Sequence, residues 1–348
     1  MKKLSIIIGV VAALAVPATV KAQQYVQDEV TAELYPNSPD SPEIQVPQGS
    51  TQYAVASLLR TEGTTAGADS KEMTTPAASA TGASEEGFSE PTAYSEYRYA
   101  HIQDNRLIGF DGDQHNGLVG FDFESYFDTI VGFNFTYTNS NLATSFTGTN
   151  FTDSINSYFF STYVAKNFDD WVNVGGSATY GRSDGQFLAQ FPGGGAFGQD
   201  TTQDSCALSP FVGVAHTWGA FSFSSTATYL WGYDHYEFEI PSPGGGTAPP
   251  NAKTLNQTFL LLNNFQYAVT DKLSVSTQIN WTRLLTIESV PTVPSTTLPP
   301  PNNMWMTFGA RADYAFNKDG TVYGVFEHDA FDTHFDDWRI RAGVNYNF

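Results

Sequence analysis

The chain ends on Trp338-Arg339-Ile340-Arg341-Ala342-Gly343-Val344-Asn345-Tyr346-Asn347-Phe348, in which every even-numbered position is apolar. Every odd-numbered position is polar or glycine. A repeat of two predicts a β-strand with one face against an apolar medium and the other against a polar one. Because a tilted strand of about 9–11 residues crosses a bilayer, the stretch predicts that the apolar medium is lipid.

The composition favours an all-β protein. The 348 residues include 18 Tyr, 27 Phe, 6 Trp and 30 Gly, and only 15% are charged, which suits many strands and turns. A formal charge of −20 argues against nucleic-acid binding through a basic surface. The single cysteine, Cys206, excludes an intramolecular disulfide, and we interpret it as a small apolar strand residue.

The N-terminus has the features of an export signal. Lys2 and Lys3 precede an apolar run, Leu4–Val16, and Val20-Lys21-Ala22 resembles a cleavage site, so residues 1–22 are expected to be a signal peptide. Its removal takes away three lysines and no acid, which changes the formal charge to −23. The alternative, a retained helical anchor, is disfavoured because the apolar run is too short to span a bilayer. Insertion is therefore expected as a barrel.

Residues 23–90 differ from the rest of the chain. They hold five prolines, four aromatic residues, and eleven acids against two bases, which predicts a disordered acidic segment rich in Thr, Ser and Pro. Thr51–Arg60 is a candidate helix. It is interpreted either as part of a linker or as a docking or plug helix.

Twelve strands are expected from about residue 105 onward. They cover Arg106–Phe110, Gly117–Glu124, Thr129–Thr138, Ile155–Ala165, Trp171–Arg182, Ser205–Thr217, Phe221–Tyr233, Leu255–Val269, Leu273–Leu285, Met304–Phe316, Thr321–Asp329 and the terminal stretch. Polar or glycine-rich loops are expected at Asp111–His115, Asn139–Asn150 and Ser183–Thr201. An even strand number with alternating short and long connections predicts an antiparallel transmembrane β-barrel with both ends in the periplasm. A soluble β-sandwich is the alternative, but its strands average about 5–6 residues.

Three stretches resemble the autotransporter β-domain, the translocator barrel of type V secretion. They are Gly117-Leu118-Val119-Gly120-Phe121-Asp122, Ile130-Val131-Gly132-Phe133 and the end from Arg341 to Phe348. The resemblance covers about residues 88–348, with the barrel domain expected at 91–348, and implies a lumen helix before the first strand, at Thr92–Gln103. It also implies that the barrel assembly machinery reads the terminal strand, with periplasmic chaperones and outer-membrane lipid as further partners. The residues of that assembly signal are Trp338, Ile340, Val344, Tyr346 and Phe348.

The resemblance implies a monomeric translocator or anchor, in the outer membrane of a Gram-negative-type bacterium, for the short segment 23–90. A small-solute porin or a structural surface barrel is the alternative. Charged residues are expected to face the lumen, as a structural ion-pair network or as a selective constriction. They are Arg311, Asp313, Glu327, Asp329, Arg339 and Arg341.

An enzyme is a weaker alternative. Asp111-Gly112-Asp113 and Asp332-Thr333-His334 both fall on the expected outer rim, where acids beside an Asp–His pair activate water in surface proteases of the omptin type. Asp and Gly are, however, common in turns for backbone reasons. The histidines have no metal-ligand spacing, and Gly193–Gly195 lacks the following Lys-Ser/Thr of a phosphate loop, so neither a metal nor a cofactor is expected.

Overall fold

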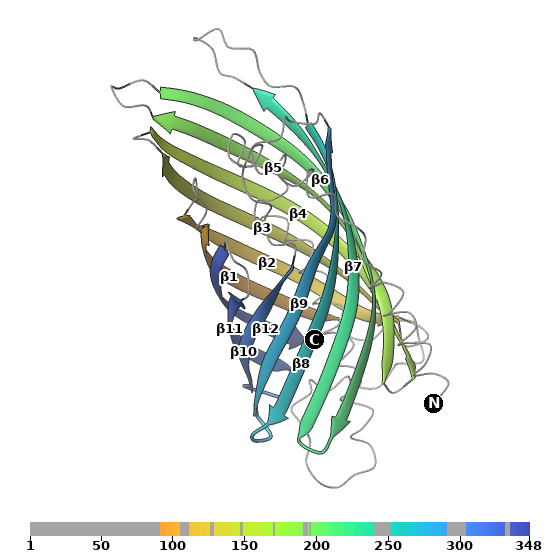
Figure 1. Ribbon diagram of the computed structural model, residues 1–348. Coiled ribbons are helices and arrows are strands. Elements are labelled where there is room, and N and C mark those ends of the chain that lie inside the picture. The colour runs from red at the N-terminus through yellow and green to blue at the C-terminus, as the bar shows by residue number, and fades with distance from the viewer. Residues whose placement is uncertain are drawn as a thin grey trace.

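The computed structural model describes residues 91–104, 111–125, 129–146, 149–169, 171–190, 194, 196–239, 252–290, 304–330 and 335–348. These residues build one closed antiparallel barrel of twelve strands, as expected (Figure 1). The expected signal peptide, the segment 23–90 and the candidate helix Thr51–Arg60 lie outside the described residues. Within the described ranges, no helix is long and apolar enough to cross a membrane.

Each strand pairs with its neighbours in the chain, and β1 closes the barrel against β12. The strands are β1 (Thr92–Asp104), β2 (Asp111–Ser125), β3 (Thr129–Phe146), β4 (Thr149–Asp169), β5 (Val172–Gln190), β6 (Ala196–Trp218), β7 (Phe221–Glu239), β8 (Ala252–Ala268), β9 (Leu273–Val290), β10 (Met304–Ala315), β11 (Gly320–Ala330) and β12 (Phe335–Asn347). The short turn between β10 and β11 lies at the same mouth as the C-terminus, because Asn347 N donates to Asp319 O.

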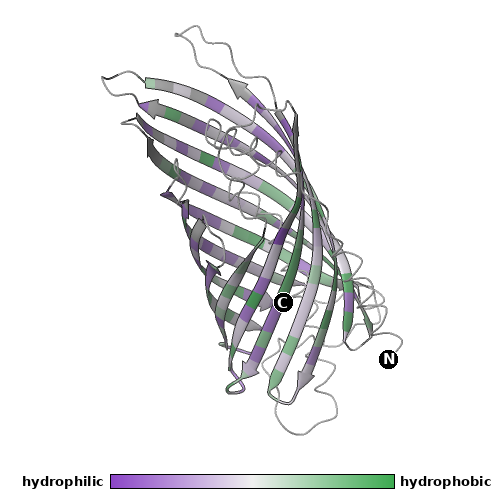
Figure 2. Cartoon of the chain, in the orientation of Figure 1, coloured by the Kyte–Doolittle hydropathy of each residue, from purple (hydrophilic) through white to green (hydrophobic). Residues whose placement is uncertain are grey.

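Burial alternates along the strands and separates an inner from an outer face. On β11, Tyr323 and Val325 are buried, whereas Val322 and Phe326 are exposed. Hydrophilic and hydrophobic residues alternate along the ribbons in the same way (Figure 2). Because successive side chains of a strand point to opposite faces, this alternation decides which residues line the interior.

The first strand is not where the sequence placed it. Thr92–Gln103, expected as a lumen helix, belongs to β1, which pairs with β12 from Thr92↔Asn347 to Asp104↔Phe335 and also with β2. The expected strand Arg106–Phe110 falls in the undescribed range 105–110. The alternation of β1 was hidden because each of its faces mixes apolar with polar residues, and only its two neighbours decide its conformation.

Several expected loops are also strands. The predicted turn Asp111–His115 opens β2, most of Asn139–Asn150 extends β3 and β4, and much of Ser183–Thr201 extends β5 and β6. Apolar residues are few in these segments and do not recur at every second position, so the segments show no hydrophobic alternation. The two mouths of the barrel therefore differ in how far the strands extend, and not only in the length of the loops.

Strand length divides the barrel into two regions. The low wall consists of β10, β11, β12 and β1, with 12, 11, 13 and 13 residues. The raised wall consists of β3 to β9, with 17 to 23 residues per strand, and extends beyond the low wall at the mouth opposite the described C-terminus (Figure 1). At about 3.3 Å per residue, ten additional residues extend a strand by roughly 33 Å.

The outer face carries a hydrophobic band bounded by aromatic residues. On β4, the exposed rings of Phe168 and Tyr158 are ten positions apart, which is roughly 33 Å along the strand and about 25 Å after a tilt of about 40°. That height matches the apolar band of an outer-membrane barrel. Beyond Tyr158 the outer face becomes polar, and Tyr137 OH and Asn139 Nδ2 donate to Asn156 Oδ1 there.

Aromatic rings on the inner face cover glycines of neighbouring strands. A Cβ added to Gly132 would collide with the ring of Tyr163, and one added to Gly120 would collide with the ring of Tyr94. Tyr163 OH also donates to Asp122 Oδ2 over 2.8 Å. Glycine at these positions therefore provides the space that lets large rings pack against the sheet.

Candidate functional site

The six charged residues predicted to face the lumen lie on the inner face of the low wall. Arg311 and Asp313 are on β10, Glu327 and Asp329 on β11, and Arg339 and Arg341 on β12. The residues of β11 and β12 are each at most 8% exposed. The strand alternation brings them together because all six occupy odd-numbered positions on three adjacent strands.

The lowest group joins Arg311 to Asp313 within one strand. Arg311 Nε donates to both carboxylate oxygens of Asp313, over 3.0 and 2.9 Å, and Nη2 donates to Oδ1 over 2.6 Å. The guanidinium carbon of Arg311 lies 4.1 Å from the centre of the Tyr323 ring. This fork-to-fork contact and the ring hold the guanidinium in one orientation.

The middle group joins four strands through Arg341. Its Nη2 donates to Glu327 Oε1 over 2.7 Å and to Gln278 Oε1 on β9 over 3.5 Å. Its Nη1 donates to Glu96 Oε2 on β1 over 3.4 Å, and Tyr323 OH donates to the same oxygen over 2.8 Å. Sequence reasoning missed Glu96 because its strand was assigned to a helix.

The upper group surrounds Arg339. Its guanidinium pairs with both carboxylate oxygens of Asp329, and Nη2 lies 3.5 Å from Asp337 Oδ2. Thr307 Oγ1 on β10 donates to Asp329 Oδ1 over 2.6 Å. The half-buried Arg98 of β1 lies opposite Arg341 in the strand register. Asp337, Thr307 and Arg98 were not among the predicted site residues.

Acids and bases nearly balance on this inner face, which we call the charge ladder. The acids are Glu96, Asp313, Glu327, Asp329 and Asp337, and the bases are Arg98, Arg311, Arg339 and Arg341. Burial makes each charge dependent on its partner, because removing one partner leaves the other uncompensated at a cost of about 3–5 kcal/mol. The ladder can therefore hold β9 to β12 and β1 in register around the closure point.

The inner face of the raised wall and β2 is different. Neutral pairs cross it: Gln114 Nε2 donates to Ser140 Oγ over 3.1 Å, and Ser183 Oγ donates to Ser157 Oγ over 2.8 Å. Three acids, Asp122, Asp153 and Asp234, are buried there. In the described part of β2 to β9, every Lys and Arg occupies an outer-facing position.

The candidate catalytic acids Asp111 and Asp113 lie on the outer face of β2, away from the lumen. Tyr99 OH donates to Asp113 Oδ1 over 2.5 Å, and His101 Nδ1 lies 3.1 Å from the same oxygen. His101 Nε2 lies 3.5 Å from Asp111 Oδ1. Asp332 and His334, the other half of the candidate site, lie outside the described residues. Sequence reasoning missed the contact with His101 because β1 was expected to be helical.

The side chains proposed as an assembly signal share the outer face of β12. Ile340 and Phe348 are 49% and 63% exposed, and the ring centres of Tyr346 and Phe348 lie 5.2 Å apart. Phe348 N donates to Pro91 O over 3.1 Å, which places the last residue beside the start of β1. The terminal aromatic is thus both exposed on the outer side of the barrel and adjacent to the closure point.

No metal centre is evident in the described part of the chain, where no three His, Cys, Asp or Glu side chains are grouped to hold an ion. Cys206 is a free, half-buried residue of β6. Gly194, the described member of the glycine triplet, has a φ of 93°, a conformation that favours glycine.

No protein-family model and no curated protein matches the sequence. Solved structures do match. The translocator domain of the autotransporter NalP from Neisseria meningitidis has a TM-score of 0.62 and 11% identity, covering 87% of this chain and 99% of its own. The β domain of the Bordetella autotransporter BrkA has a TM-score of 0.57 and 15% identity, covering 74% and 100%.

The transport unit of the autotransporter AIDA-I from Escherichia coli has a TM-score of 0.54 and 10% identity, covering 86% of this chain and 99% of its own. At these identities the likeness concerns the fold. The expected fold, a twelve-stranded antiparallel barrel like those of autotransporter translocators, is confirmed.

Proposed function

We propose that this chain is an outer-membrane translocator or anchor of the autotransporter type, which displays residues 23–90 after removal of a signal peptide at 1–22. The observation that carries the proposal is the closed twelve-stranded barrel whose first and last strands meet at one mouth, at Thr92↔Asn347. A segment preceding β1 at the periplasmic mouth has to pass through the barrel to be displayed.

The outer surface supports an outer-membrane location. An exposed apolar band about 25 Å high, with Tyr158 and Phe168 at its two edges, suits the hydrocarbon layer. The polar outer face beyond Tyr158 suits the lipid headgroups and the cell exterior. We propose that the barrel is a monomer whose lipid contacts come from this band.

The charge ladder has a structural role in this proposal. It secures the low wall, where strands are short, and no catalytic step is assigned to it or to Asp111 and Asp113. The exposed terminal aromatic residues are proposed to be read by the barrel assembly machinery. Deleting Phe348 should lower the amount of barrel in the outer membrane, measured by membrane fractionation, and unchanged levels would contradict the assembly role.

Display is tested with a protease-cleavable epitope inserted after Gly67. Whole cells treated with external protease should lose this epitope. An epitope in the Lys318–Asp319 turn should stay intact, because that turn lies at the mouth of the termini. An epitope in the loop 291–303 should be cut. Protection of the Gly67 epitope while the 291–303 epitope is cut would rule out display.

A small-solute pore is the second candidate function. It is favoured by one observation, the contrast across the lumen between the charge ladder and the opposite inner face, which carries Asp122, Asp153 and Asp234 but no described base. Purified barrel in planar bilayers should then conduct ions, and replacing Arg341 by Gln should change the selectivity between cations and anions. A barrel that conducts no current would leave the anchor role alone.

A further inference from the structure

An open groove lies on the outer face of the barrel, where the low wall joins the raised wall. Its volume is about 660 Å³. This lies within the range of ligand sites, about 300–1,000 Å³. The outward-facing residues of its lining come from four adjacent strands: Phe265 and Tyr267 of β8, Val275 and Thr277 of β9, Ala310 and Ala312 of β10, and Gly324 and Phe326 of β11. The groove therefore opens onto the apolar outer surface and not into the lumen.

Small side chains form the floor of this groove. Ala312 of β10 lies opposite Gly324 of β11 in the strand register, and Ala310 lies opposite Phe326. A Cβ added to Gly324 would meet no atom closer than 4.0 Å, so the space above this residue is open. The exposed rings of Phe265 and Phe326 stand on the two sides. A low floor between two rings suits a slender apolar chain such as the acyl chain of a lipid.

Two hairpin turns flank the end of the groove at the mouth of the termini. The turn between β8 and β9 carries Asp271 and Lys272, and the turn between β10 and β11 carries Lys318 and Asp319. The turns are neighbours, because Ala315 N donates to Lys272 O over 2.8 Å. The floor of the groove begins about 10 Å along β9 from the first turn. A lipid whose chain lies in the groove would place its headgroup beside these turns.

The two turns carry two bases and two acids. Lys318 is 84% exposed, and its Nζ lies 3.8 Å from Asp319 Oδ2, a long contact that leaves the ammonium available to a ligand. Asp271 and Lys272 are both exposed. Lysine ammonium groups bind phosphate, and carboxylates accept hydrogen bonds from an ammonium group. The set therefore matches a headgroup with one phosphate and one amine better than a purely anionic headgroup, which the two carboxylates would repel.

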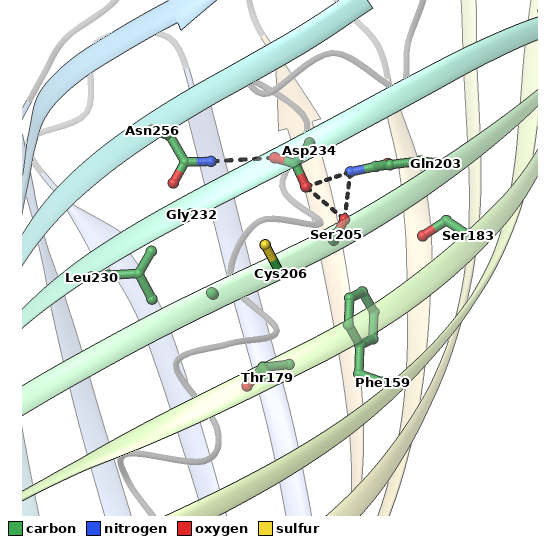
Figure 3. A pocket seen from close by; sticks show the side chains of 11 residues that line it. Phe159, Thr179, Ser183, Gln203, Ser205, Cys206, Leu230, Gly232, Asp234 and Asn256 are labelled. Atoms are coloured by element: carbon green, nitrogen blue, oxygen red, sulfur yellow. Dashed lines mark hydrogen bonds between the residues drawn. The ribbon is translucent and has the colours of Figure 1, made fainter.

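A cavity in the raised wall offers no comparable site (Figure 3). Its volume is about 30 Å³, enough for one or two waters. Its carboxylate, Asp234, accepts hydrogen bonds from Gln203, Ser205 and Asn256. These polar groups bind one another within the protein, so we assign no ligand to this cavity.

We propose that the groove binds one phosphatidylethanolamine molecule, a phospholipid with a phosphate and a primary amine, from the periplasmic leaflet. One acyl chain lies over Ala310, Ala312 and Gly324. The two lysines of the turns donate to the phosphate oxygens, and the two aspartates accept from the ammonium group. The inference rests on the outer-membrane location proposed above, and it adds one lipid with a defined headgroup to the contacts of the hydrophobic band.

The test is native mass spectrometry of the purified full-length barrel in detergent. Phosphatidylethanolamine, phosphatidylcholine and phosphatidylglycerol with identical acyl chains are added at equal concentrations. One ethanolamine lipid per barrel should be retained, at least about threefold over the other two, because choline has no N–H to donate and glycerol carries no cation. Retention of none of the lipids, equal retention of all three, or preference for either of the other two would overturn the proposal.

This result is independent of display, because the lipids are offered to the isolated barrel. Protection of the Gly67 epitope on whole cells would overturn display and leave the lipid preference as it is. Loss of the lipid preference would overturn the groove site and leave display as it is.

Variants of the turns assign the preference to the headgroup contacts. The double variant Lys272→Gln, Lys318→Gln should lower the affinity for the ethanolamine lipid roughly tenfold. The double variant Asp271→Asn, Asp319→Asn should reverse the preference, so that the glycerol lipid is retained above the ethanolamine lipid. All four residues lie in short turns at the surface, so these variants should fold. An unchanged preference in both double variants would contradict the site.

A third variant tests the position of the acyl chain. Gly324→Leu should fill the groove and lower the retention of all three lipids, and the open space above this glycine admits the new side chain without a clash. Lys253→Gln is the control, because it removes an exposed lysine at the other end of β8, and it should leave retention unchanged. Retention in Gly324→Leu equal to that of the wild type would contradict the placement of the chain.

Discussion

The low wall and the raised wall are parts of one sheet, yet their interiors are built from different chemistry. On the low wall, β11 has 11 residues and carries Glu327 and Asp329, which pair with arginines of β12. On the raised wall, β6 has 23 residues, and the described inner positions of β3 to β6 are mostly Ser, Thr, Asn, Gln, Gly and apolar residues.

The difference shows where each region derives its stability. The backbone ladder between β5 and β6 runs from Val172↔Val214 to Gln190↔Ala196. The ladder between β11 and β12 runs only from Gly320↔Tyr346 to His328↔Trp338. Between β11 and β12, where fewer main-chain hydrogen bonds form, buried ion pairs across the two strands help to fix their register. Between the longer strands of the raised wall, neutral hydrogen-bonded side chains take this place.

Breaking the charge ladder should have the largest effect. Arg339→Ala leaves Asp329 and Asp337 buried without their guanidinium, so the free energy of unfolding should fall by about 3–5 kcal/mol. Urea unfolding of the barrel in detergent or lipid vesicles measures this. The matched control is Arg182→Ala on the outer face of the raised wall, where the side chain is 57% exposed and the expected loss is at most about 1 kcal/mol. Equal losses of unfolding free energy in the two variants would show that the buried ion pairs stabilise the barrel no more than an exposed one does.

Placing a charge in the lipid-facing band should have the next largest effect. Phe326 lies on the outer face of the low wall, halfway along β11, and is 50% exposed. Phe326→Arg should destabilise the folded barrel by about 2–4 kcal/mol in vesicles. Trp218→Arg, at the short turn between β6 and β7, should cost only about 0–1 kcal/mol. A reversed order would mean that the hydrophobic band has been placed wrongly.

Filling the space beneath an aromatic ring should have a moderate effect. Gly132→Ala forces the ring of Tyr163 away from β3 and disturbs its hydrogen bond to Asp122, with an expected loss of about 1–3 kcal/mol in unfolding free energy. Gly117→Ala is the control, since a Cβ there meets no atom within 4 Å. Similar stabilities for the two variants in urea titrations would argue against the packing role.

Breaking a neutral pair of the raised wall should have the smallest effect. Ser161 and Thr179 hydroxyls are 2.8 Å apart, and Ser161→Ala should cost about 1 kcal/mol. The comparison with Arg339→Ala in the same urea titration sharpens the contrast between the two walls. A loss of unfolding free energy as large as that of Arg339→Ala would show that the neutral hydrogen-bonded pairs contribute as much stability as the ion pairs.

Some of the candidate site followed from the sequence. The alternation in β12 was enough to place Arg339 and Arg341 on the face opposite Ile340, because side-chain direction in a strand depends only on residue parity. It could not identify Glu96 as a partner of Arg341, since the two residues are 245 positions apart and meet only when the barrel closes. Asp337 is different, because it lies two positions before Arg339 on β12 and its parity places it on the same face; it was missed because the expected strand began at Trp338.

By itself, the sequence determined that this is a chain of long amphipathic strands ending on an aromatic residue of the apolar face, because a period of two is a local property. Tertiary structure decided the strand identity of Thr92–Asp104, the height of the raised wall and the partners of each buried charge. These depend on which strands become neighbours. Polar segments such as 139–146 have no hydrophobic pattern, and pairing with both neighbouring strands is what makes them β-structure.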